Sequence, residues 1–343
     1  MLFRKSAARN QPEAAAPQAA VPGQAEALLR RLEWTVIRRL DGLLQGDYRT
    51  LMRGAGLDLA DLREYQLHDD VRHIDWNVTA RLQVPHVRVF TEDREMAAWF
   101  LLDLSASVDF GSGEQTKRQL ATEFTAVIAR LLTRHGNRVG ALMYGTQVDG
   151  MLPARSGRRH VLQLLHQMSA HRGGAAAPQG SVTRLRDLLL AGAQAIRRRS
   201  TVFVVSDFIS EPGWEDALAQ LAQRHEVVAV RLLDPLEASL PNLGLVPLRD
   251  AETGDLLWVD TANPSFRARF ERVAADNEDR LHAALGASGV DALELLTDGD
   301  LVDALMRFTE MRQRRLQRRG AQGAVRTTHL QTLNPQTLTR EAV

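Results

Sequence analysis

Apolar residues recur at helical spacing near the start of the chain. Between residues 25 and 44 they are Leu28, Leu29, Leu32, Val36, Ile37, Leu40 and Leu44. Intervals of three and four residues place these side chains on one face of a helix. We therefore predict an amphipathic helix that docks on the body of the protein. Residues 1–24 are rich in Ala, Pro and Gln, and we expect them to form a flexible tail.

From residue 96 onward, short apolar runs alternate with helical patterns. The expected strands cover residues 98–103, 138–144, 147–152, 201–206, 226–232 and 290–296. The expected helices cover residues 114–134, 158–170, 183–198, 214–224, 264–285 and 300–318. Strands that alternate with helices form parallel sheets, and continuous apolar runs indicate burial on both faces. The pattern therefore predicts an α/β protein with a doubly wound, mostly parallel sheet.

Two segments depart from this alternation. Residues 46–95 are polar and irregular, with one expected strand over 86–91. Residues 241–260 have the pattern of a β-hairpin that turns at Glu252-Thr-Gly254. The expected organisation is then a disordered tail (1–24), a helix and β-containing module (25–95), the sheet domain with its hairpin insertion (96–318), and a flexible tail (319–343).

Composition narrows the class of protein. Lys and Arg number 43 against 42 Asp and Glu, a balance that argues against a dedicated nucleic-acid or polybasic membrane protein. We therefore expect the basic run 312–319 to be a solvated helix face. The absence of cysteine excludes disulfides, thiolate metal sites and a cysteine nucleophile. No membrane span or signal peptide is apparent, so we expect a soluble, cytoplasmic protein.

Oxygen-bearing side chains gather where the expected strands end. Asp103, Ser105 and Ser107 lie at positions i, i+2 and i+4 at the end of one strand, Asp207 follows another, and Thr183 opens a helix. In doubly wound sheets, ligands bind outside the carboxyl ends of the strands. Two carboxylates and three hydroxyls form an oxygen shell that suits Mg²⁺. One coordination position would remain for a carboxylate of a partner.

These residues resemble a known motif. Asp103-x-Ser105-x-Ser107, with a later Thr and a later Asp, is similar to the metal-ion-dependent adhesion site of von Willebrand factor A domains. A longer stretch resembles the bacterial "domain of unknown function fifty-eight" family. The matching segments are Gly54-Ala-Gly-Leu-Asp58, Leu62-Arg-Glu-Tyr65, Asp69-Asp-Val-Arg72, Ile74-Asp-Trp-Asn-Val-Thr-Ala-Arg81, Leu102-Asp-Leu-Ser-Ala-Ser107 and Ser206-Asp-Phe208.

The resemblance covers residues 46–318 and implies a von Willebrand factor A-like domain. It also implies a non-enzymatic, chaperone-like adaptor that works with a MoxR-type AAA+ ATPase or its client in protein-complex assembly. The implied ion is Mg²⁺, with Mn²⁺ or Ca²⁺ as possible occupants of the same oxygens. Relatives usually have Thr-Asp-Leu where this chain has Thr183-Arg-Leu185, so Ser181 is an alternative source of the third hydroxyl.

Other interpretations remain open at this point. Asp and Ser also cap helices, so the motif is compatible with a metal-free interaction module. A strand-end aspartate is typical of metal-dependent phosphohydrolases, although Ser105 occupies the place of their second carboxylate. A second metal site is conceivable at His68, Asp69, Asp70, His73 and Asp75. We favour for that segment an Asp–Arg network anchored by Trp76.

Overall fold

Six strands form one sheet at the centre of the computed structural model, which describes residues 23–40, 61–66, 71, 74, 76–89, 97–171, 183–249 and 255–330. The six strands are β3 (Ala97–Asp103), β4 (Arg138–Tyr144), β5 (Val148–Arg155), β6 (Thr201–Ser206), β7 (Glu226–Leu233) and β10 (Asp291–Leu296). Their order is β10-β7-β6-β3-β4-β5, and all neighbours are parallel except β4 and β5. The predicted doubly wound, mostly parallel sheet is confirmed.

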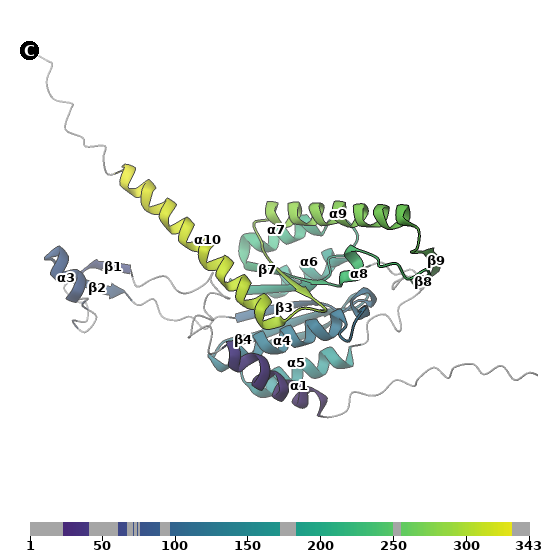
Figure 1. Cartoon of the computed structure of the whole chain (residues 1–343). Helices are drawn as coiled ribbons and strands as arrows, with labels where there is room; N and C mark the ends of the chain where they lie inside the picture. The colour runs from purple at the N-terminus through teal and green to yellow at the C-terminus, as the bar shows by residue number, and fades with distance from the viewer. Residues whose placement is uncertain are drawn as a thin grey trace, which may run out of the picture.

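Helices cover both faces of this sheet (Figure 1). On one face, α4 (Lys117–Arg134) and α5 (Arg158–Ala170) pack over Phe100 and Phe203, whose rings stack with centroids 5.2 Å apart. On the other face, α6 (Leu185–Ala195), α7 (Trp214–Arg224) and α9 (Pro264–Ala287) cover Leu101 and Val204. Successive side chains of a strand point to opposite faces, so the continuous apolar runs fill two cores.

The first predicted helix docks on the sheet domain. It consists of α1 (Gln24–Leu32), which continues through the π-helical turn η1 (Glu33–Ile37). Its buried residues are Leu29, Leu32, Ile37 and Leu40. Arg158 of α5 donates to Glu26, with Nη2 2.7 Å from Oε1, and holds the helix from outside the core. The prediction is confirmed through residue 40; residues 41–44 lie outside the described part.

Several boundaries differ from those predicted. α4 begins three residues later than expected, because Thr116 and Gln119 form a reciprocal capping box. α6 covers less than the predicted 183–198, and Thr183 lies two residues before its first turn. β5 extends beyond the predicted residue 152, to Arg155, along the antiparallel edge of the sheet.

The last helix, α10 (Leu301–Leu330), runs past its predicted end at residue 318. The added residues 319–330 include two Ala and two Arg, which favour helix, and two Gly, which do not. The prediction that the run 312–319 is solvated is wrong at Arg312. This side chain is buried, and its Nε donates to Asp291 Oδ2 at 2.9 Å. In the described part of the chain, no helix is both long and apolar enough for a membrane crossing.

The two outlying segments contain small sheets. β1 (Asp61–Glu64) pairs antiparallel with β2 (His86–Val89), and α3 (Trp76–Leu82) lies between them in sequence. Trp76 is 70% exposed at the start of α3, so its predicted role as an anchor is wrong. The charged residues 68–70, 72, 73 and 75 lie outside the described residues. The predicted hairpin is confirmed as β8 (Leu245–Arg249) and β9 (Leu256–Asp260); its turn lies outside the description.

Candidate metal site

The predicted carboxylate and hydroxyls come together where β3 ends. Asp103 is its last residue, Ser105 caps the short helix η4 (Ala106–Asp109), and Ser107 lies within that helix. All three are buried. Asp103 Oδ1 accepts from the Ser105 N–H at 3.0 Å, and the Oγ atoms of Ser105 and Ser107 are 3.1 Å apart. The backbone turn thus aligns one carboxylate and two hydroxyls.

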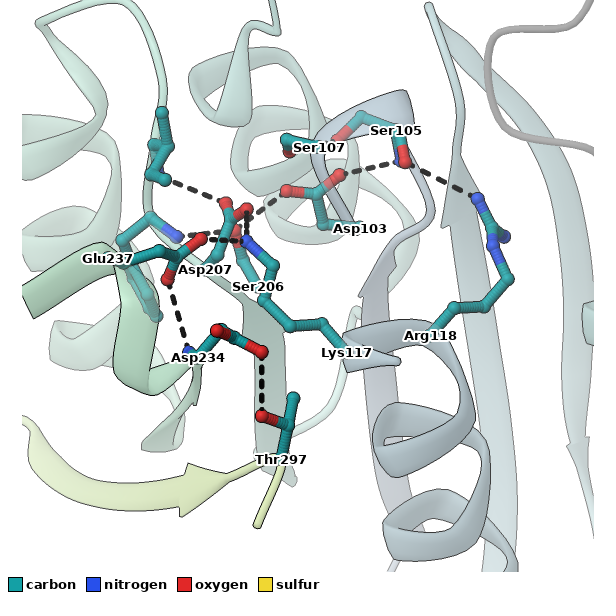
Figure 2. A network of polar contacts seen from close by, with 12 residues as sticks. Asp103, Ser105, Ser107, Lys117, Arg118, Ser206, Asp207, Asp234, Glu237 and Thr297 are labelled. Atoms are coloured by element: carbon teal, nitrogen blue, oxygen red, sulfur yellow. Dashed lines mark hydrogen bonds and ion pairs between the residues drawn. The ribbon is translucent and has the colours of Figure 1, made fainter. Parts of the chain in front are cut away.

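The neighbouring strand β6 brings a second carboxylate to the same edge. Ser206, its last residue, donates from Oγ to Asp103 Oδ2 at 2.7 Å and accepts from the Phe208 N–H at 2.9 Å. Asp207 is buried, and its Oδ1 accepts from the Ile209 N–H at 3.0 Å. Phe208 has φ +60°, an uncommon conformation for a bulky residue that is often found at functional sites. Figure 2 shows both aspartates facing the same space.

The negative charge of Asp207 is close enough to act on Asp103. Burial, together with the negative charge of Asp207, raises the pKa of Asp103 to about 6, although hydrogen bonds from Ser206 and Ser105 act in the opposite direction. A buried carboxylate with such a pKa gains from a nearby cation, because the cation favours the charged form. The arrangement therefore favours a positively charged ligand.

Thr183 is less directly placed. It is buried, and its carbonyl accepts from the Glu211 N–H at 3.1 Å and from Ser210 Oγ at 2.9 Å. These bonds hold the segment before α6 against the loop that follows β6. The adjacent Arg184 N–H donates to the Tyr144 hydroxyl at 2.9 Å, and Tyr144 is the β4 residue opposite Asp103. Ser181, the alternative hydroxyl, lies outside the described residues.

Lys117 is a site residue that the sequence analysis missed. Lys117 is the first residue of α4, and its side chain is buried. Its Nζ is 2.7 Å from Asp207 Oδ2 and 2.6 Å from Glu237 Oε1 (Figure 2). Burial lowers the pKa of Lys117, but the charges of Asp207 and Glu237 outweigh it, so the pKa is raised. A lysine in the first turn opposes the helix dipole. Its position after the Thr116 cap was therefore the signal for a special role.

Further polar contacts stiffen the surroundings. Glu237 belongs to α8 (Pro235–Ala238), whose cap Asp234 accepts from the Ser112 N–H and from Thr297 Oγ1, both at 2.8 Å. On the other side, Arg118 Nη2 donates to the carbonyl of Leu104 at 2.8 Å. Loops after β3, β7 and β10 are thereby joined. The side chains of the site are held before any ligand arrives.

The donor set fits a magnesium ion. Mg–O distances of about 2.0–2.1 Å place adjacent ligands of an octahedron about 3 Å apart, and the hydroxyls of Ser105 and Ser107 are separated by 3.1 Å. Both Asp207 oxygens already accept hydrogen bonds, one from Lys117. This arrangement suits a carboxylate that contacts the ion through water. Ser105 and Ser107 would be the direct ligands, with Asp103 behind them.

A second group of possible metal ligands has a simpler explanation. Glu278, His282 and Glu294 are the one such cluster of three or more among the described residues. Arg231 already pairs with Glu278, and its Nη1 is 3.7 Å from Glu294 Oε1. His282 Nε2 contacts Glu278 Oε1 at 2.7 Å. The guanidinium thus serves as the cation of this group.

The chain is similar to proteins of one family. Residues 61–280 match the family described as "Protein of unknown function DUF58". The chain belongs to the DUF58 family. It is 38% identical over 288 residues to "Uncharacterized protein Rv1480" of Mycobacterium tuberculosis, covering 84% of this chain and 90% of that protein. It is also 32% identical over 163 residues to "Uncharacterized protein MAV169" of Mycobacterium avium, covering 48% of this chain and 94% of the relative.

Solved structures that resemble this DUF58 protein are more distant. The conserved hypothetical protein BatB from Bacteroides thetaiotaomicron is 14% identical, with a TM-score of 0.41 and coverage of 64% of this chain and 99% of BatB. The SpRpn10 VWA domain is 13% identical, with a TM-score of 0.33 and coverage of 62% and 94%. The fold of this chain is defined by its own strand order and pairing.

Proposed function

We propose that this DUF58 protein is a non-enzymatic adaptor that binds Mg²⁺ through Asp103, Ser105, Ser107, Thr183 and Asp207. Mn²⁺ or Ca²⁺ is expected to fit the same oxygens. The ion holds a carboxylate of a protein partner in its open coordination position. The observation that supports this most directly is the pair of serine hydroxyls 3.1 Å apart, in front of the buried Asp103, at the carboxyl end of β3.

The proposed partner is a MoxR-type AAA+ ATPase or one of its clients, as the family resemblance implies. The encounter would take place in the cytoplasm, during assembly or maturation of a protein complex. The rigid surroundings of the site support a binding role, since a site that is already ordered loses little entropy when a partner arrives.

Isothermal titration with Mg²⁺ and Mn²⁺ tests the ion. Wild type is compared with Asp103→Ala and with Asp298→Ala, a matched control in which an exposed aspartate is removed after β10 at the same edge of the sheet. We expect binding to wild type and to the control, and none to Asp103→Ala. Equal binding to all three proteins would place the ion elsewhere.

Partner capture tests the function. A purified MoxR-type ATPase is passed over immobilised wild type or Asp103→Ala in Mg²⁺ and in EDTA. Retention by wild type in Mg²⁺ but not in EDTA supports the proposal. Retention that neither EDTA nor the substitution changes indicates a metal-free interaction module.

A phosphoester substrate with Mg²⁺ tests the enzymatic alternative, in which turnover is lost in Asp103→Asn. Ser105 bonds to Ser107 where a phosphohydrolase would have a second carboxylate, so we expect no turnover.

A further inference from the structure

The β8–β9 hairpin presents apolar side chains to solvent. Leu256 and Trp258 of β9 are 66% and 64% exposed, and Leu245 of β8 is 64% exposed. The register places Pro247 opposite Trp258, so these four residues share one face of the hairpin. Isolated exposed apolar residues are ordinary, but a contiguous apolar face is typical of an interaction site.

Hydrogen bonds close the base of the hairpin. Val259, which points to the opposite face, is buried at 5% exposure, whereas Leu257 on that face is 65% exposed. Thr261 closes the two strands: its N–H and its Oγ both donate to the Gly244 carbonyl, at 2.8 and 2.7 Å, and its Oγ accepts from the Leu243 N–H at 2.9 Å. The two strands are therefore tied together at their base, beside one buried apolar side chain.

The hairpin also has an open edge. Within the described residues, neither β8 nor β9 pairs with a third strand. A two-stranded hairpin is marginal by itself, and a further strand stabilises it. Pro247 has no N–H and therefore weakens the outer edge of β8 for pairing, whereas β9 contains no proline. β9 is thus the edge along which another strand can add.

The charge of the hairpin indicates what would bind there. Residues 245–260 contain one arginine and four acidic residues: Arg249, Asp250, Glu252, Asp255 and Asp260. Such a negative segment is repelled by anionic lipid and attracts a basic polypeptide. We propose that an extended segment of a protein partner, in which apolar and basic residues alternate, adds as a third strand along β9. Its apolar side chains would cover Leu256 and Trp258.

This inference extends the proposed function, because the hairpin would be a second contact for the partner held by the metal site. Lys117 links Asp207 of that site to Glu237 of α8, and β8 begins shortly after α8. Figure 1 shows α8 and the hairpin on the same side of the sheet. A partner that reaches the ion can therefore also reach β9.

A peptide-binding experiment in EDTA tests the hairpin apart from the metal. The probes are three labelled short peptides, followed by fluorescence anisotropy: alternating Val and Lys, alternating Val and Glu, and the Val–Lys peptide with a central proline. The proteins are wild type, the double variant Leu256→Thr/Trp258→Thr, Asp103→Ala and the control Val273→Thr. Val273 is an exposed apolar residue of α9, and threonine retains the strand preference in the hairpin.

We expect the Val–Lys peptide to bind wild type, Asp103→Ala and Val273→Thr alike. The double variant, with an unchanged melting temperature, should bind it roughly tenfold more weakly, and the other two peptides should lose a similar factor. Undiminished binding by the double variant or of the proline peptide would overturn the proposal. A dimer of wild type that the double variant abolishes, or Trp258-dependent sedimentation with phosphatidylglycerol vesicles, would assign the hairpin to a second copy or to a membrane instead. Failure of metal titration alone would leave this result intact.

Discussion

Lys117 Nζ lies 2.7 Å from Asp207 Oδ2, and both side chains are almost completely buried. The lysine comes from the first turn of α4 and the aspartate from the loop after β6, so one ion pair joins a helix start and a loop of the site. Glu237 shares the same ammonium group at 2.6 Å. The candidate metal site thus contains a permanent cation of its own beside one of its two carboxylates.

Lys117→Met should destabilise the protein strongly. It leaves Asp207 buried without its partner, and removal of one member of a buried ion pair costs about 3–5 kcal/mol. Urea unfolding measures the loss. Arg184→Met is the matched control, because the Arg184–Glu211 pair is exposed and should cost under about 1 kcal/mol. Equal losses in the two variants would show that burial does not set the strength of the Lys117 pair.

The stability of the metal-free protein should depend on Asp103 and pH. Burial, with the charge of Asp207, raises the pKa of Asp103 to about 6 in the folded state, against about 3.9 in an unfolded chain. The folded protein then binds this proton more tightly. The stability that this bound proton contributes is complete below about pH 4 and is lost as the pH rises through about 6.

Asp103→Asn has no such proton. In EDTA, the free energy of unfolding of Asp103→Asn relative to that of wild type should therefore rise by up to about 3 kcal/mol between pH 4 and pH 8. Urea unfolding measures this difference. Asp298→Asn, at an exposed position, should keep a constant difference from wild type. If the difference for Asp103→Asn also stays constant, Asp103 titrates alike in the folded and unfolded states.

Magnesium should raise the melting temperature of wild type. A ligand at a hundred times its dissociation constant stabilises the folded state by about 2.7 kcal/mol. Ser105→Ala removes one proposed direct ligand and should abolish most of this shift. Ser169→Ala, a serine of α5 whose Oγ donates to the Leu165 carbonyl, is the control and should keep it. A shift that survives Ser105→Ala would remove this hydroxyl from the proposed ligand set.

Two helical glycines should respond to alanine in opposite ways. A Cβ at Gly192 of α6 would lie 2.7 Å from Leu101 Cδ1 of β3, so in Gly192→Ala the buried Leu101 side chain or the helix itself must shift. Overpacking of this kind costs about 1–3 kcal/mol. A Cβ at Gly286 of α9 meets nothing within 4 Å, so Gly286→Ala should stabilise by about 0.5–1 kcal/mol through the unfolded state. Thermal unfolding of both variants decides whether the α6–β3 contact is as close as described.

Local patterns in the sequence predicted most of the fold. Continuous apolar runs located β3 and β6, and the rule for the carboxyl ends of parallel strands brought Asp103 and Asp207 to one site. Boundaries failed where a single contact decides them, as at the Thr116–Gln119 capping box. Trp76 was misplaced because a large aromatic residue usually anchors a core.

The missed residues depend on distant neighbours. Ser206 bonds to Asp103 across 103 positions of sequence, and Lys117 bonds to Asp207 across 90. No local spacing records such contacts, since the strand order that creates them is a property of the whole sheet. Arg312 was predicted to be solvated for the same reason, because its hydrogen-bond partner Asp291 belongs to another element, β10. Side chains that join elements are therefore the ones that pattern analysis finds last.

The central position of β3 also affects how the protein emerges from the ribosome. β3 pairs with β4 on one side and with β6 on the other, and β6 is synthesised about a hundred residues later. Until β6 appears, one edge of a strand that is apolar up to Asp103 has no partner, and Asp103 lacks both Ser206 and Asp207. Contacts between residues so far apart in sequence form slowly, and apolar surface stays exposed until they form. The nascent chain would therefore become able to bind the proposed ion only after the interval in which the edge of β3 has no partner.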